Sequence, residues 1–117
     1  MDEKKKEEVL QRIQQLHDKF RLNLEDRMIS IDSAWAQVQN TPGDEAIQQD
    51  LYRAVHSIAG TAGTFGFPEL GISARKLVNV LKEWQKDPVN SLESQQSMII
   101  GALDLLRTDI KKIVNDR

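Results

Sequence analysis

The sequence predicts an all-α fold: an antiparallel up-down four-helix bundle with an additional N-terminal helix. Apolar residues recur at steps of three and four along the whole chain, and no segment shows the alternation of a strand. Pro42, Pro68 and Pro88 divide this pattern into segments. Helices with one apolar stripe each and short connections pack antiparallel. We therefore expect a single bundle domain over residues 1–117, with the extra helix capping one end.

The first segment is predicted to hold two helices, at residues 4–21 and 24–39. Its stripe begins at Val9 and continues through residue 38 with an average step of about 3.6, so the pattern also permits one long helix. We favour a break near residues 21–24, because Asn23 can cap a new helix and a helix of about 36 residues is unusual in a small domain.

The next helix is predicted over residues 44–65, after the turn sequence NTPGD, with Thr41 or Asp44 as its cap. Gly66 can adopt the left-handed conformation that ends a helix, and Phe67 can then fold back onto the last turn.

Two further helices are predicted, over residues 68–86 and 91–114. Pro68 suits the first position of the former, and Asn90-Ser91-Leu92-Glu93 has the spacing of a capping box for the latter. Trp35 and Trp84 lie in the apolar stripes, so we expect both in the core.

Composition excludes several classes of function. The 16 Lys and Arg against 18 Asp and Glu leave a charge of −2, so no basic field holds a nucleic acid. The absence of cysteine excludes disulfides and thiolate chemistry, and His17 and His56 are too far apart in sequence to indicate a metal site. No apolar run approaches the ~18 residues of a membrane span, and the start MDEKKKEE lacks a signal peptide's apolar stretch. We expect a cytoplasmic monomer.

His56 is the residue that stands out. On a helical wheel it lies opposite the apolar stripe of residues 44–65 and faces water. Its predicted neighbours on that outer face, which we expect to dock a partner, are Tyr52, Arg53, Ala59, Gly60 and Gly63. Each glycine inside a helix costs about 1 kcal/mol relative to alanine. The glycines therefore either admit a neighbouring helix or clear a landing area for another protein beside the imidazole.

The surroundings of His56 exclude most chemistry. No carboxylate lies within a turn of it, and Ser57 is about 100° around the helix, so neither a triad nor a Ser–His dyad is indicated. The run Gly60-Thr61-Ala62-Gly63 lacks the Lys-Ser/Thr ending of a phosphate-binding loop. Nucleophilic catalysis remains, because a neutral imidazole can accept a phosphoryl group.

The run His56-Ser57-Ile58-Ala59-Gly60-Thr61-Ala62, followed by Gly66, Leu70, Ala74 and Leu77, resembles the histidine-containing phosphotransfer (HPt) domains of bacterial phosphorelays. Their pattern is roughly H-S-L-K-G-x-A, then G, then L…A…L. The resemblance implies a four-helix bundle whose exposed histidine, here His56, carries a phosphoryl group between receiver-domain aspartates or from a histidine kinase. It implies a carrier without a nucleotide site, kinase activity or cofactor of its own, with Mg²⁺ supplied by the partner. The expected partners are a response-regulator receiver domain and a hybrid histidine kinase.

The sequence departs from the family pattern at two places. Many members carry a lysine three residues after the histidine, where this chain has Ala59, so the balancing cation must be another residue: Arg53, Arg75 or Lys76. Leu77 is followed by Val78 where the family often has glutamate, which should affect packing or partner contact more than chemistry. The alternatives are an interaction domain that docks without phosphorylation and, less favoured, an autonomous enzyme. His17 is expected at the boundary of the first stripe.

Overall fold

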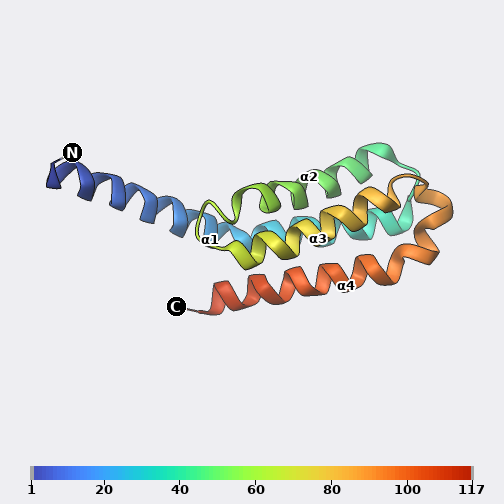
Figure 1. Ribbon diagram of the computed structural model, residues 1–117. Coiled ribbons are helices and arrows are strands. Elements are labelled where there is room, and N and C mark those ends of the chain that lie inside the picture. The colour runs from blue at the N-terminus through green and yellow to red at the C-terminus, as the bar shows by residue number, and fades with distance from the viewer. Residues whose placement is uncertain (1, 117) are drawn as a thin grey trace.

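The computed structural model describes residues 2–116, and this part of the chain is helical throughout apart from its connections. It contains α1 (Glu3–Asn40), α2 (Glu45–Thr61), α3 (Pro68–Trp84) and α4 (Pro88–Asn115), and no strand. Each helix runs antiparallel to the one before it (Figure 1). Contacts join α1 to α2, α2 to α3, α3 to α4 and α4 back to α1, so the helices enclose one core. The prediction of an all-α bundle is confirmed.

The predicted break near residues 21–24 is wrong, because α1 is one helix of 38 residues that passes through Asn23. The segment contains neither glycine nor proline, and Phe20, Leu24 and Met28 remain on one buried face. Asparagine inside a helix costs less than about 1 kcal/mol, whereas burial of a large apolar side chain contributes about 1.5–3 kcal/mol. Burial on both sides of the position therefore outweighs the local capping signal.

The N-terminal part of α1 projects beyond the other helices (Figure 1). Phe20 is the first buried residue of the chain, and Val9, Ile13 and Leu16 before it are 48%, 56% and 44% exposed. The expectation that an extra helix caps one end of the bundle is therefore wrong. The molecule is elongated, with extents of 60 × 25 × 19 Å. We call residues 3–19 the α1 overhang.

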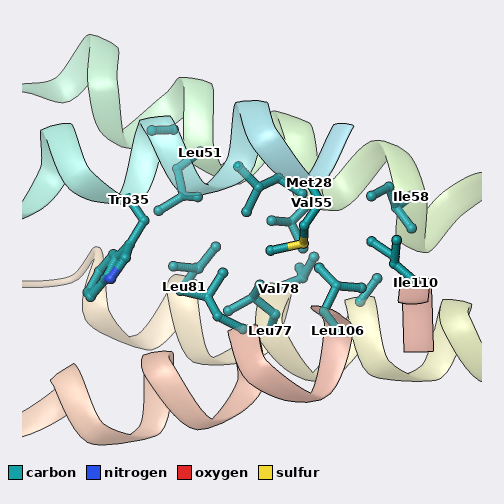
Figure 2. Packing of buried hydrophobic residues seen from close by; sticks show 14 of the residues in the cluster. Met28, Trp35, Leu51, Val55, Ile58, Leu77, Val78, Leu81, Leu106 and Ile110 are labelled. Carbon is teal, nitrogen blue, oxygen red and sulfur yellow. The ribbon is translucent and has the colours of Figure 1, made fainter. Parts of the chain in front are cut away.

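The core lies among all four helices (Figure 2). Trp84 is 1% exposed and its indole N–H donates to the carbonyl of Pro88 at 3.0 Å, while Trp35 is 8% exposed. Both tryptophans are core residues, as predicted. Other fully buried side chains are Leu24, Ile31, Leu51, Val55, Ile58, Leu77 and Leu106.

Asp44 caps the N-terminus of α2, and Gly66 closes the turn that follows its C-terminus. The Asp44 carboxylate accepts hydrogen bonds from the backbone N–H groups of Ala46 and Ile47, at 3.0 and 3.3 Å. The helix ends at Thr61, earlier than predicted, and residues 62–66 form a turn. Gly66 has φ +92°, and the N–H of Phe67 donates back across the turn to the carbonyl of Ala62 at 2.8 Å. The predicted left-handed glycine is confirmed.

The capping box predicted at residues 90–93 is wrong, because α4 begins at Pro88 with Asp87 as its N-cap. Pro88 has the φ that a first helical position requires, so the helix starts three residues before Ser91. The Ser91 hydroxyl donates to the carbonyl of Asp87 at 2.6 Å, and the Asn90 amide donates to the Asp87 carboxylate at 3.2 Å. The preceding helix, α3, ends at Trp84.

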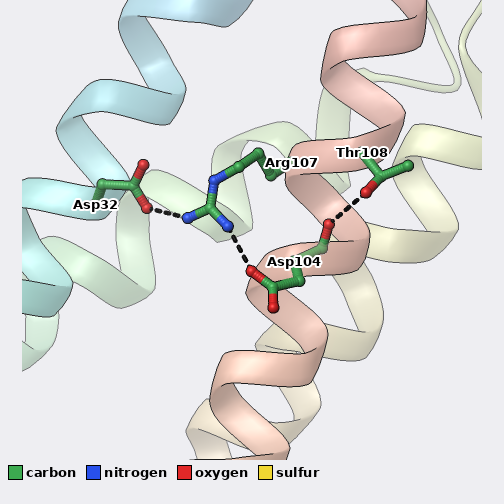
Figure 3. Close-up of polar contacts among 4 residues, drawn as sticks. All are labelled: Asp32, Asp104, Arg107 and Thr108. Atoms are coloured by element: carbon green, nitrogen blue, oxygen red, sulfur yellow. Dashed lines mark hydrogen bonds and ion pairs between the residues drawn. The ribbon is translucent and has the colours of Figure 1, made fainter.

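Polar contacts add links between helices away from the core. Arg107 on α4 donates to Asp32 on α1 at 2.6 Å and also to Asp104 one turn earlier on α4 (Figure 3). Partial burial works to lower the pKa of Arg107, but the hydrogen bonds and charges of the two aspartates outweigh it and raise the pKa. Ser73 on α3 donates to the Asp109 carboxylate on α4. These contacts hold α4 against both of its neighbours.

Candidate functional site

His56 lies beyond the middle of α2, on the side of that helix that faces away from the core. Val55 and Ile58 are fully buried and fix the rotation of the helix, so the exposed imidazole of His56 points outward. Its ring stacks on Tyr52, with centroids 5.6 Å apart and planes at 22°. Within residues 2–116 no hydrogen bond or ion pair engages it. The structure thus presents an exposed imidazole that packs against one neighbouring ring.

The surface beyond His56 is open. A Cβ atom added at Gly60 on α2, or at Gly63, which lies in the turn after α2 and not inside the helix as predicted, would meet no neighbouring atom within 4 Å. The explanation that these glycines admit a neighbouring helix is therefore wrong. Instead Gly71 on α3 lies at the helix contact, where an added Cβ would be 3.7 Å from the Cβ of Ala62 and 3.9 Å from the carbonyl oxygen of Ala59.

The structure brings together the residues predicted to dock a partner. Arg53, Gly60 and Gly63 are exposed, and Tyr52 and Ala59 are half-buried at the edge of the same face. The helical spacing of α2 places four of them around His56, and Gly63 follows in the turn after the helix. Contact with a partner remains a prediction for these five residues.

The three candidate cations lie on two helices, Arg53 on α2 and the other two on α3. Arg53, Arg75 and Lys76 are all exposed. Arg53 lies on α2 itself, about 60° from His56. Arg75 follows Gly71 by one turn of α3, so it lies on the side of α3 that faces α2. Lys76 is about 100° further round that helix, toward the side where Ser73 binds α4. The arrangement favours Arg53 and Arg75 over Lys76.

Ser57 and His17 both contact other parts of the bundle. The Ser57 hydroxyl accepts a hydrogen bond from Arg27 of α1 at 3.3 Å, and the Arg27 guanidinium lies 5.3 Å from the centroid of the Phe20 ring. Ser57 is therefore directed to the α1 side, as expected from its angle on the helix. The His17 side chain is 33% exposed and its ring stacks on Phe67 at 4.6 Å, which confirms it as a boundary residue.

The described residues show neither a metal cluster nor a membrane span. Between residues 2 and 116, no three His, Cys, Asp or Glu side chains gather closely enough to hold a metal ion. Over the same range, each helix is too short or too polar to cross a bilayer.

Comparison with known proteins assigns the family. A family model of the Hpt domain matches residues 6–115. The chain belongs to the Hpt domain family. The Hpt chain is also 20% identical over 89 residues to a chemotaxis protein CheA of Halobacterium salinarum, an alignment that covers 76% of this chain and 13% of that protein. The chain thus spans only a small part of the length of that relative. No solved structure matches it significantly. The Hpt match supports a phosphotransfer-type domain in signalling.

Proposed function

We propose that this Hpt domain is a phosphoryl carrier, with His56 as the acceptor and donor of the group. The observation that carries the proposal is the exposed imidazole of His56 beside two open glycine positions, in a chain that matches the Hpt model over residues 6–115. The expected partners are a receiver domain whose aspartate holds the phosphoryl group and a histidine kinase. The direction of transfer depends on which of the two is phosphorylated.

The transfer follows from the chemistry of a neutral imidazole, which has one ring nitrogen with a free lone pair and one N–H group. The lone pair of His56 attacks the phosphorus of an aspartyl phosphate on the receiver. The new N–P bond forms as the O–P bond breaks, and the aspartate leaves as a carboxylate. The other ring nitrogen keeps its proton. The reverse step returns the group to a second receiver.

In this proposal the chain contributes the nucleophile and the surface around it, and the partner contributes the groups that hold the phosphoryl group. No carboxylate lies within one turn of His56 on α2 to activate a water molecule beside it, so the adduct should persist until a receiver docks. In this proposal the receiver supplies Mg²⁺ and the acidic pocket that hold the phosphoryl group. The open positions at Gly60 and Gly63 let that pocket approach the imidazole.

Arg75 is the cation that we propose in place of a lysine at position 59. It lies on the α2 side of α3, beyond the close contact of Gly71 with Ala59. Ala59 has a short side chain, so the long Arg75 side chain can extend over it toward His56. A guanidinium is permanently charged and donates to phosphate oxygens. Arg53 supplies a second positive charge from the opposite flank.

Phosphotransfer from receivers tests the function. The chain is incubated with labelled, phosphorylated receivers from its own organism. Label should appear on the wild type, disappear in His56→Gln and remain in His17→Gln, a matched control because these are the two histidines of the chain. His56 is exposed, so its substitution should change stability by no more than about 0.5 kcal/mol. Label retained in His56→Gln, or label taken from ATP by the chain alone, would overturn the proposal.

A second candidate function rests on Ala59. The lysine of many relatives is absent there, which is compatible with a bundle that docks partners without being phosphorylated. Receivers that bind the chain but never label it would support this alternative.

A further inference from the structure

The α1 overhang carries an apolar surface that the bundle does not cover. Val9, Ile13 and Leu16 are 48%, 56% and 44% exposed, and Leu10 beside them is 65% exposed. Their spacing places them on one side of the helix. None of residues 3–19 is buried. An apolar stripe along a helix normally packs against another surface, so this side of the overhang should have a partner.

The size of the exposed surface agrees with a missing partner. A compact monomer of 13.3 kDa should expose about 6,450 Å², whereas this chain exposes 7619 Å². Its radius of gyration is 16.6 Å, against about 13.4 Å for a compact domain of 117 residues. The excess of roughly 1,200 Å² exceeds the ~800 Å² that each chain contributes to an interface of standard size. The apolar side of the overhang and the groove are the part of this excess that a dimer would bury.

A groove continues the apolar side at the base of the overhang. It lies between α1 and the turn that joins α2 to α3, and its lining includes Ile13, Leu16, His17, Phe65 and Gly66. Gly66 has no side chain there, and the His17 ring stacks on Phe67 of the turn. The groove can therefore receive an apolar side chain that approaches along the overhang.

We propose that the occupant is a second copy of this chain, with the two overhangs packed antiparallel. A two-fold axis near residues 12 and 13 places Val9 of each copy against Leu16 of the other. The same axis brings Leu10 of each copy to the groove of the other. This interface is isologous, because the same residues serve both copies. The proposal replaces the expectation of a monomer.

The antiparallel orientation follows from where α1 enters the bundle. From Phe20 onward the apolar face of α1 is buried in its own core. A parallel pair would place both bundles at the same end, where they would collide beside that residue. An antiparallel pair separates the bundles, and its contact at the groove lies eight residues beyond His56, at Thr64 in the turn that follows α2. Dimer formation and phosphoryl transfer are therefore separable.

Sedimentation equilibrium of the full chain over a concentration series tests the proposal. The wild type should approach twice the mass of 13.3 kDa, and Ile13→Glu should remain at the single-chain mass. The matched control is Leu22→Glu, which replaces a 71% exposed leucine on the opposite side of the same helix and should dimerise like the wild type. Circular dichroism checks that all three are folded.

Three outcomes would overturn the proposal. In the first, the wild type stays at the single-chain mass up to about 1 mM, which would leave the overhang to another protein. In the second, the Ile13→Glu variant still dimerises. In the third, Leu22→Glu dissociates the dimer as much as Ile13→Glu does. Labelling of His56 should be the same in Ile13→Glu as in the wild type, so failure of the dimer and failure of the carrier function are distinguishable.

Spin labels test the orientation, because the chain has no cysteine and a single introduced cysteine defines the labelled position. In the antiparallel dimer, labels on Gln11→Cys should be about 5 Å apart along the helix axis and labels on Lys5→Cys about 22 Å apart. Equal separations at the two positions would indicate a parallel pair and contradict the proposed interface.

Discussion

Substitution of Gly63 separates a docking role from a packing role. Its φ is not positive, and an added Cβ would meet nothing within 4 Å, so alanine fits without strain. Gly63→Ala should stabilise the chain by about 0.4–1 kcal/mol, because alanine has fewer conformations in the unfolded chain. Unfolding entropy of about 2.1 cal/mol/K per residue over 117 residues converts this into a rise in Tm of about 2–4 °C. Thermal denaturation followed by circular dichroism measures it.

A larger side chain at Gly63 then tests docking directly. Gly63→Leu should fold as well as the wild type, because the position opens to solvent. It should slow transfer from a phosphorylated receiver, since a small displacement of the reacting groups is costly. Reaction of His56 with a small-molecule phosphodonor, which needs no docking, should be nearly unchanged. Unfolding of Gly63→Leu, or an equal loss of both reactions, would refute the reasoning.

Three further substitutions test other parts of the account. Gly66→Ala should lower the free energy of unfolding by at least about 1 kcal/mol in urea denaturation, because φ is +92° and a Cβ would lie 3.2 Å from the His17 ring; unchanged stability would contradict this. Arg75→Gln should slow receiver-to-His56 transfer about fivefold and the matched Lys76→Gln should not; equal effects would contradict the assignment of Arg75. Arg107→Gln should cost up to about 1 kcal/mol at low salt and less at 1 M salt, since the ion pair is partly exposed; a cost independent of salt would indicate a packing role.

The exposure of His56 could be predicted from the sequence because it depends only on helical periodicity. Leu51, Val55 and Ile58 define the buried side of α2, and a residue opposite to them must face outward. The left-handed Gly66 in the turn after α2 was equally predictable, since a glycine after an apolar run is a local signal for positive φ. Features of this kind need no knowledge of the other helices.

The continuity of α1 and the exposure of its overhang could not be predicted from periodicity and local signals. The capping signal at Asn23 is local, whereas burial of Phe20 and Leu24 depends on contacts with the rest of the bundle. The apolar step from Val9 to Leu16 looks the same whether or not another helix covers it. The contact at Gly71 was missed because one glycine next to a stripe does not show which neighbouring helix approaches it.

Localisation of the phosphoryl group on the intact chain tests the central claim most directly. After incubation with a phosphorylated receiver, the chain is fragmented and each fragment is weighed by mass spectrometry under basic conditions, which preserve a phosphoramidate. We expect one phosphoryl group per chain, on His56, that is lost on brief exposure to acid. A phosphoryl group on His17, on a hydroxyl or on a carboxylate, or no group with any receiver of the organism, would contradict it.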